Sequence, residues 1–194
     1  MALSLLIAAH PSNGQETGRL KVWLGLGYAI QQEASSLGGG PALWLEPSYR
    51  LSRNVVIGLR LESASLAPQL TLLNVNAGPN PSDIILPTEK SMTYSVSING
   101  QYYFTKNGFR PYLGIGVGYF LLPSVSSNGI TISEAVNTFG VYPRTGFDYG
   151  HFTLALDFNI IPLQTTTTAL HITTERNASY LALKVGYSIW RNKK

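Results

Sequence analysis

Residues 94–119 read YSVSINGQYYFTKNGFRPYLGIGVGY, and this stretch decides the fold class. On both sides of the central TKNG, apolar or aromatic residues occupy almost every second position. Alternation with a period of two is typical of a β-strand whose two faces meet different surroundings. The pair Asn107-Gly108 strongly favours a tight hairpin turn. The stretch therefore predicts two antiparallel strands, at 94–104 and 110–119.

The same alternation recurs along the rest of the chain, most weakly at 139–148. In each segment one face is apolar and the other consists of small, polar or charged residues. With about nine to eleven patterned residues, a segment has the length of a tilted membrane-spanning strand. The eight expected strands are 20–28, 43–51, 55–62, 94–104, 110–119, 139–148, 152–159 and 181–189.

The connections between these segments alternate in length. Short turns lie at 52–54, 105–108 and 149–151, whereas long connections lie at about 29–42, 63–93, 121–138 and 160–180. This alternation is typical of an up-and-down barrel, and it places both termini at the short-turn end. We predict an all-β fold, an eight-stranded antiparallel up-and-down transmembrane β-barrel.

The apolar faces are too bulky for the interior of an eight-stranded barrel, which is only just wide enough for side chains to fill. They carry no charged residue, and the opposite faces hold most of the strand glycines. We therefore expect the apolar faces to contact lipid and the opposite faces to line a polar lumen. The expected lumen charge network contains Lys21, Glu46, Arg50, Arg60, Glu62, Arg144, Asp157 and Lys184, with Arg110 and Asp148 on the same faces.

Buried ions are tolerated when they are paired and hydrogen-bonded, so six cations and four carboxylates in one lumen predict salt bridges. Two interpretations follow. The network could plug a narrow barrel, or it could have a function as a gated pore or as a network whose ions switch partners. The narrow lumen of eight strands favours the plug.

Aromatic residues on the apolar faces gather near both ends of the expected strands. Two aromatic girdles around an aliphatic band are a signature of membrane barrels. We expect lipid-facing Tyr49, Tyr102, Phe104, Phe147, Phe152 and Tyr187 near the short turns, and Tyr28, Tyr94, Tyr119 and Phe139 near the long loops.

Composition narrows the class further. Charged residues make up 12% of the 194 residues, about half the usual globular share. The net charge of +4 comes from scattered basic residues, with one small cluster at 191–194, so we expect no nucleic-acid partner. The chain has no cysteine, which excludes disulfides and thiolate metal sites. We expect no cofactor and no metal.

The first residues differ from the rest. Residues 2–9 read ALSLLIAA, which matches the apolar core of an export signal, although a basic start is lacking. We predict a signal segment at 1–15 and a barrel domain at 16–194. The alternative is an ordinary N-terminal strand or short helix.

Three stretches resemble a known group of proteins: GGPALWLEPSYRLSRNVVIGLRLE at 39–62, the stretch at 94–119, and YPRTGFDY at 142–149. They are similar to the small eight-stranded outer-membrane β-barrel proteins of the OmpA/OmpX/OmpW-like superfamily, in particular those common in Bacteroidetes. The resemblance covers roughly residues 19–190 and implies a bacterial outer-membrane location. Such barrels usually finish on an outward aromatic residue, whereas this chain continues past Ile189 to Lys194.

Few residues indicate chemistry. Gly114, Gly116 and Gly118 form a GxGxG run, but no helix is expected after it, so a nucleotide site is not supported. We interpret these glycines as space for bulky lumen neighbours.

Three histidines remain. His10 lies in the expected signal and His151 in a tight turn. A lipid-modifying enzyme would need His171 with Glu175 or Ser179, and no spacing supports that arrangement. We expect no catalytic residue.

We therefore expect a non-enzymatic surface protein with a closed polar lumen and long extracellular loops. Its partners would be outer-membrane lipid or lipopolysaccharide and other envelope proteins, and the barrel would be a monomer. The alternatives are a narrow channel or lateral conduit for small hydrophobic molecules, a lipid-modifying enzyme, and a soluble lipocalin-like carrier. The long loop 66–91 suits either a partner surface or a cover for the barrel mouth; its apolar residues are Leu70, Leu72, Leu73, Ile84, Ile85 and Leu86.

Overall fold

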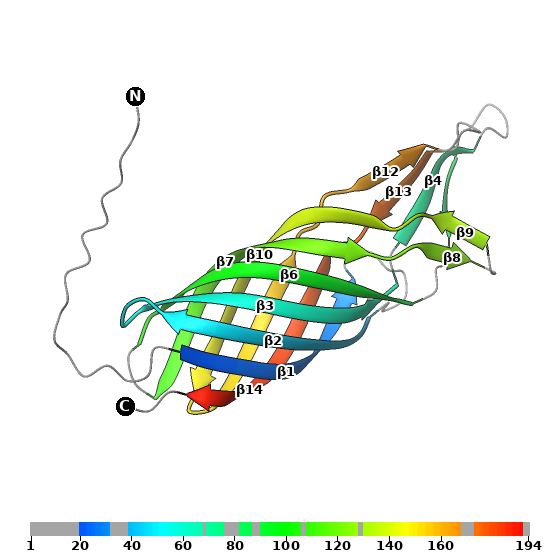
Figure 1. The fold of residues 1–194 in the computed structure, drawn as a ribbon. Helices are drawn as coiled ribbons and strands as arrows, with labels where there is room; N and C mark the ends of the chain where they lie inside the picture. The colour runs from blue at the N-terminus through cyan, green and yellow to red at the C-terminus, as the bar shows by residue number, and fades with distance from the viewer. Residues whose placement is uncertain are drawn as a thin grey trace, which may run out of the picture.

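The computed structural model shows a closed barrel of eight antiparallel strands (Figure 1). The structure describes residues 20–31, 39–67, 69–75, 82–86, 90–105, 108–127, 130–167 and 173–191. The barrel strands are β1 (Leu20–Gln31), β2 (Gly40–Arg50), β3 (Val55–Leu66), β6 (Ser91–Tyr103), β7 (Phe109–Leu122), β10 (Val136–Tyr149), β11 (Phe152–Asn159) and β14 (Tyr180–Arg191).

The strand order confirms the up-and-down prediction. Around the barrel it is β1-β14-β11-β10-β7-β6-β3-β2, so successive barrel strands are neighbours and β14 closes the barrel against β1. Closure gives every barrel strand a hydrogen-bonded neighbour on both sides, and internal pairing of this kind is what lipid requires of a spanning structure. Among the described residues, no helix is long and apolar enough to span a membrane.

Three short turns join barrel strands at one end, which we call the short-turn end. In the turn from β2 to β3, the Leu51 amide donates to the Val55 carbonyl at 3.0 Å. The other two turns use glycine in the left-handed region, at Gly108 (φ 64°) and Gly150 (φ 61°), a conformation that glycine adopts without steric cost. Lys21 pairs with Arg191 near this end, so β1 starts and β14 finishes there.

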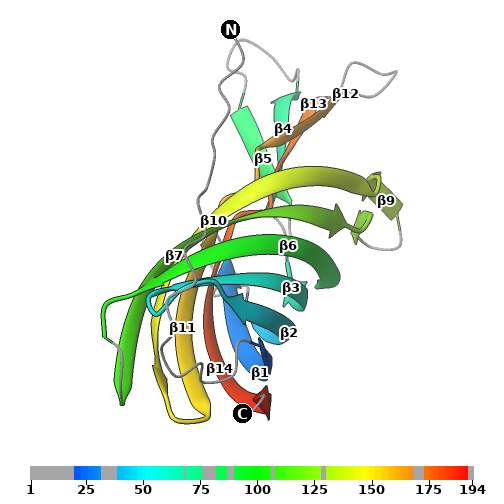
Figure 2. The same ribbon diagram turned by 60° about the vertical axis from the view of Figure 1, so that its left-hand side comes forward.

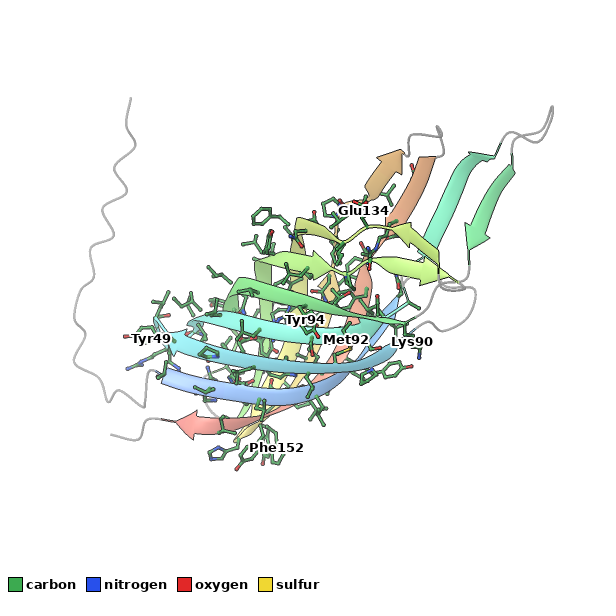
Figure 3. All side chains as sticks on the ribbon, turned by 45° about the vertical axis from the view of Figure 1, so that its right-hand side comes forward. Tyr49, Lys90, Met92, Tyr94, Glu134 and Phe152 are labelled. Atoms are coloured by element: carbon green, nitrogen blue, oxygen red, sulfur yellow. The ribbon has the colours of Figure 1, made fainter. Side chains whose placement is uncertain are left out.

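The two faces of the strands are sorted as the alternation predicts. On the outside, Ile115 is 63% exposed and Leu24 is 48% exposed, whereas Arg60 and Lys184 inside are 0% and 1% exposed. Figure 3 shows the side chains of Met92 and Tyr94 on the outer surface, with Tyr49 and Phe152 nearer the short-turn end. This arrangement is the reverse of a lipocalin-like barrel, in which apolar side chains fill the interior.

Glycines on the inner face make room for large lumen side chains. A β-carbon at Gly116 would overlap the Tyr142 ring, and one at Gly25 or Gly186 would overlap the Trp44 indole. Gly118 is similarly close to Phe120 and Ser97. The interpretation of the GxGxG run as lumen space is confirmed.

Strands also extend beyond the barrel at the opposite, long-loop end (Figure 2). Four of them form an antiparallel sheet in the order β12-β13-β4-β5, which we call the projecting sheet. A separate pair is formed by β8 and β9. The bounds are β4 (Gln69–Val75), β5 (Ser82–Leu86), β8 (Val125–Ser127), β9 (Ile130–Ser133), β12 (Gln164–Thr167) and β13 (Thr173–Asn177).

The projecting sheet corrects the expectation of long loops. The connections 63–93 and 160–180 contain strands that pair with each other, as in the register of Leu72 with Thr174. The pairing joins segments about a hundred residues apart in the chain, so local spacing could not reveal it. The side chains of Leu70, Leu72, Leu73, Ile84, Ile85 and Leu86 lie outside the described ones, whereas Leu66 is buried and Ala67 is half-buried.

Candidate functional site

Six charged side chains meet at the centre of the lumen. Each comes from the inner face of a barrel strand, and all are almost completely buried. They are Glu46 on β2, Arg60 and Glu62 on β3, Arg144 on β10, Asp157 on β11 and Lys184 on β14. Their period-two spacing on the small, polar faces is the reason they converge.

Asp157 is the hub of this central cluster. Its carboxylate accepts hydrogen bonds from Arg60 Nη1 and from Lys184 Nζ, the latter at 2.9 Å. Arg144 Nε lies 3.2 Å from the other carboxylate oxygen. One carboxylate therefore shares its negative charge among three cations, which come from three different strands.

Two further carboxylates complete the neutralisation. Arg144 Nη1 donates to both oxygens of Glu46, at 3.0 and 2.8 Å. Glu62 accepts from Lys184 Nζ, and Arg60 Nε lies 3.2 Å from its Oε2 atom. Three cations face three carboxylates, so the centre of the lumen carries no net charge.

Aromatic and amide side chains on the same faces support the ions. The Arg60 guanidinium lies 3.9 Å from the centroid of the Tyr142 ring, and the Arg144 guanidinium lies 5.5 Å from that of Tyr112. Gln101 Nε2 donates to Glu46 at 2.8 Å. Our sequence reasoning omitted these partners, although each shares the strand face of the charged residues.

An apolar layer closes the lumen on the long-loop side of the ions. Phe120, Leu122, Leu66 and Ile161 are buried there among alanines from five segments. Tyr180 belongs to this layer and donates its hydroxyl to Glu62 at 3.0 Å. The described lumen is therefore filled by side chains at its centre and at its long-loop end.

The remaining lumen charges lie at the short-turn end. Lys21 and Arg50, expected in one network with the central ions, instead line a separate hollow. We call it the short-turn mouth, and its wall consists of Lys21, Trp23, Ser48, Arg50, Val56, Tyr103, Arg110 and Asp148. The lumen charges thus lie at two levels of the barrel. Tyr103 joins these levels, because its hydroxyl contacts both Asp148 and Gln101, and Gln101 donates to Glu46.

The outer surface carries a band of exposed apolar side chains with aromatic residues toward both ends. Tyr102 and Phe104 pack edge to face at 5.6 Å, and Tyr119 and Phe139 pack at 5.1 Å. Of the girdle residues named from the sequence, Phe147 is half-buried against Phe109. The others are exposed: Tyr28, Tyr49, Tyr94, Tyr102, Phe104, Tyr119, Phe139, Phe152 and Tyr187.

The histidines provide no catalytic constellation among the described residues. His151 lies in a turn, where its ring stacks on Tyr187 at 5.5 Å. Ser179 is buried, and its hydroxyl donates to the Ile161 carbonyl at 3.1 Å. His10 and His171 lie outside the described residues. Within the described part of the chain, no group of three His, Cys, Asp or Glu side chains could hold a metal ion.

Arg176 connects the projecting sheet to the barrel. It is buried on β13, and its Nη1 atom donates to the Pro123 carbonyl at 2.8 Å, just after β7. Burial lowers the pKa of this guanidinium to about 10, because the charged form loses hydration. Gln31 on β1 makes a second connection, since its Nε2 atom donates to the Asn177 carbonyl at 2.6 Å.

Solved structures with this fold are known, although no protein-family model and no curated protein matches the sequence. Neisserial surface protein A is 14% identical, with a TM-score of 0.55 over 90% of this chain and 100% of that one. OprG of Pseudomonas aeruginosa is 16% identical, with a TM-score of 0.55 over 89% and 97%. The N-terminal β-barrel domain of Pseudomonas aeruginosa OprF is 14% identical, with a TM-score of 0.52 over 90% and 100%.

The chain therefore has the fold of the small eight-stranded outer-membrane β-barrels. Its own surface supports the same class, because ions are buried on the axis and aliphatic side chains are exposed between aromatic girdles. The protein is a membrane-spanning β-barrel, and its fold is that of solved barrels of the bacterial outer membrane. In such barrels the short turns face the periplasm and the longer connections face the exterior.

Proposed function

We propose that the protein is a non-enzymatic outer-membrane anchor that presents its projecting sheet at the cell surface. The observation that carries this proposal is the contrast between the filled barrel and the projecting sheet. The lumen is filled by neutralised ions and an apolar layer, whereas the long connections form a four-stranded sheet outside the barrel. A filled lumen suits a rigid support, and extracellular connections are where barrels differ in function.

The partners we propose are other envelope proteins and the lipid or lipopolysaccharide around the barrel. We propose that the barrel is a monomer. No second copy is needed to cover a strand edge, because every barrel strand has a neighbour on both sides.

Planar-bilayer recording together with surface proteolysis tests this role. The purified full chain should give no stepwise conductance, and proteinase K added to intact cells should cut within residues 69–86 and leave the barrel strands protected. Replacement of 69–86 by a short Gly-Ser linker should preserve the heat-modifiable gel mobility of the barrel. Stable conductance by the wild-type protein, or protection of the sheet on intact cells, would contradict the proposal.

A second candidate, a lateral conduit for small hydrophobic molecules, is supported by the pairing of β10. The β10–β11 ladder ends at Arg144 and Asp157, apart from one bridge between Val141 and Ile160. On the long-loop side of this bridge, residues 136–140 of β10 pair only with β7 among the described strands. The apolar layer with Phe120 lies inside the same end of the barrel.

Uptake of a small hydrophobic dye into intact cells distinguishes the two candidates. A conduit predicts that the wild-type protein accelerates uptake and that Phe120→Ala accelerates it further. An anchor predicts uptake equal to that of cells without the protein.

A further inference from the structure

The barrel closes where its first and last strands meet. β1 and β14 are hydrogen-bonded neighbours (Figure 1), although they lie at opposite ends of the described chain and no turn joins them. In a hairpin the turn fixes the register of its two strands, and the closing seam between β1 and β14 has no such constraint. Its register therefore depends on side chains that cross the seam.

The indole of Trp44 crosses this seam on the lumen side. Trp44 on β2 is the register partner of Gly25 on β1, and Gly25 is the register partner of Gly186 on β14. A β-carbon at Gly25 would overlap the Nε1 and Cε2 atoms of the indole, and one at Gly186 would overlap its Cζ2 and Cη2 atoms. The ring therefore lies across two consecutive strands and covers a glycine on each.

Packing, rather than hydrogen bonding, holds the ring in place. Trp44 is 2% exposed, and its Nε1 atom has no hydrogen-bond partner among the described residues. Thr153 on β11 is the register partner of Gly186, and its methyl group would be too close to a β-carbon there. Glycine in a strand interior often marks such a close approach, so the two glycines form the seat of the indole.

Other registers of the closing seam conflict with the lipid or with the ring. A shift of one residue would turn the inner face of β14 outward and would carry Lys184 from the lumen into lipid, where a charge is costly. A shift of two residues keeps the faces but brings Lys184 or Ser188 opposite Gly25 in place of Gly186. Either side chain would overlap the indole, because even a β-carbon at that place does.

We propose that Trp44 locks the register in which the last strand closes the barrel, with Gly25 and Gly186 as its seat. A shift of two residues would change the stagger of the strands, which is linked to the width of a barrel. It would also displace Lys184 from Glu62, since this ion pair joins β14 to β3 across the seam. Trp44 is thus a positioning residue for the central cluster, and this inference goes beyond the proposed surface role and does not depend on it.

Disulfide trapping across the seam tests the lock, because the chain has no cysteine of its own. The pair Leu26→Cys and Val185→Cys reports the native register, since these residues are register partners and both are exposed on the outer face. Leu26→Cys with Leu183→Cys, or with Tyr187→Cys, reports a shift of two residues. Directly opposite cysteines are close enough for a disulfide and diagonal ones are not. The full chain in lipid vesicles should therefore cross-link only in the native pair.

Trp44→Ala should raise the ratio of shifted to native cross-linking about fivefold or more, because relief of an overpacked site shifts an equilibrium by at least that factor. Gly186→Ala should raise the same ratio, since a methyl group beneath the ring removes the advantage of the native register. Trp44→Phe should give an intermediate ratio, because a phenyl ring is too short to cover both glycines.

Tyr142→Ala is the matched control, because the Tyr142 ring likewise covers a glycine, Gly116, but at the seam between β7 and β10. It should destabilise the barrel and leave the cross-linking ratio of the closing seam unchanged. Heat-modifiable gel mobility verifies that each variant is folded, and Gly186→Ala and Trp44→Phe test the lock if Trp44→Ala does not fold. The proposal is overturned if the folded Trp44 and Gly186 variants cross-link only in the native pair, or if Tyr142→Ala raises the ratio as much as they do.

Discussion

Arg60 on β3 and Asp157 on β11 form an ion pair directly across the barrel. Their strands are four places apart in either direction around the eight-stranded ring. The same holds for Glu46 on β2 and Arg144 on β10, which pair at 2.8 Å. These two cross-barrel pairs connect opposite walls that share no backbone hydrogen bonds, so the lumen ions hold the cross-section of the barrel together.

Asp157→Asn tests the hub of the central cluster. The amide has nearly the shape of the carboxylate but leaves Arg60, Lys184 and Arg144 short of one negative charge. Breaking a buried ion pair on one side costs about 3–5 kcal/mol. We expect a loss of that size in the free energy of unfolding, measured by urea titration in lipid vesicles. Asp148→Asn, at the short-turn mouth, should cost less, because the 3.7 Å ion pair of Asp148 with Lys21 is longer than the ion pairs of Asp157. Equal losses would contradict the role of the hub.

The Glu46–Arg144 pair can be tested by a double-mutant cycle. Glu46→Gln and Arg144→Met should each destabilise the barrel, because each leaves a buried partner unpaired. The double variant should be less destabilised than the sum of the two, with a coupling free energy above about 1 kcal/mol. Additive effects on the free energy of unfolding would show that the contact between Glu46 and Arg144 does not stabilise the barrel.

Two glycines on opposite faces provide a matched test of lumen packing. Gly116→Ala places a methyl group where the Tyr142 ring lies, whereas Gly100→Ala meets nothing within 4 Å. Overpacking typically costs about 1–3 kcal/mol. We expect Gly116→Ala to lower the urea midpoint. Gly100→Ala should leave the midpoint unchanged or raise it slightly, because a strand is more stable with alanine than with glycine in its interior.

Sequence reasoning recovered the strands and their faces because period-two alternation is local. Each barrel strand overlaps a segment named from the pattern, and Arg60 and Leu59 point in opposite directions as expected. The alternation at Ala64 and Leu66 continues the β3 pattern beyond the expected end at 62.

Partner choice in the lumen could not be read from the sequence. It depends on which non-neighbouring strands face each other and on their relative stagger, and these are properties of the closed barrel. For this reason the sequence predicts one set of lumen charges but does not show that Lys21 and Arg50 line the mouth. The projecting sheet was missed for a related reason, because β4 and β13 belong to different connections.

Arg176→Gln tests the attachment of the projecting sheet. The substitution removes the donor to the Pro123 carbonyl and leaves the barrel strands untouched. We expect proteinase K to cut the sheet several-fold faster in the purified protein, because local opening becomes easier, while the urea midpoint of the barrel stays the same. Glu175→Gln, the half-buried neighbour on the opposite face of β13, is the control and should leave the cutting rate unchanged.

The orientation of the barrel faces is tested most directly by electron paramagnetic resonance of spin labels in lipid vesicles. Labels on Leu59→Cys, Ile115→Cys and Leu183→Cys, all exposed on the outer face, should collide with oxygen, which concentrates in lipid. They should be shielded from a water-soluble nickel complex. Labels that collide freely with the nickel complex, in a protein that stays soluble without detergent, would contradict the membrane-spanning barrel.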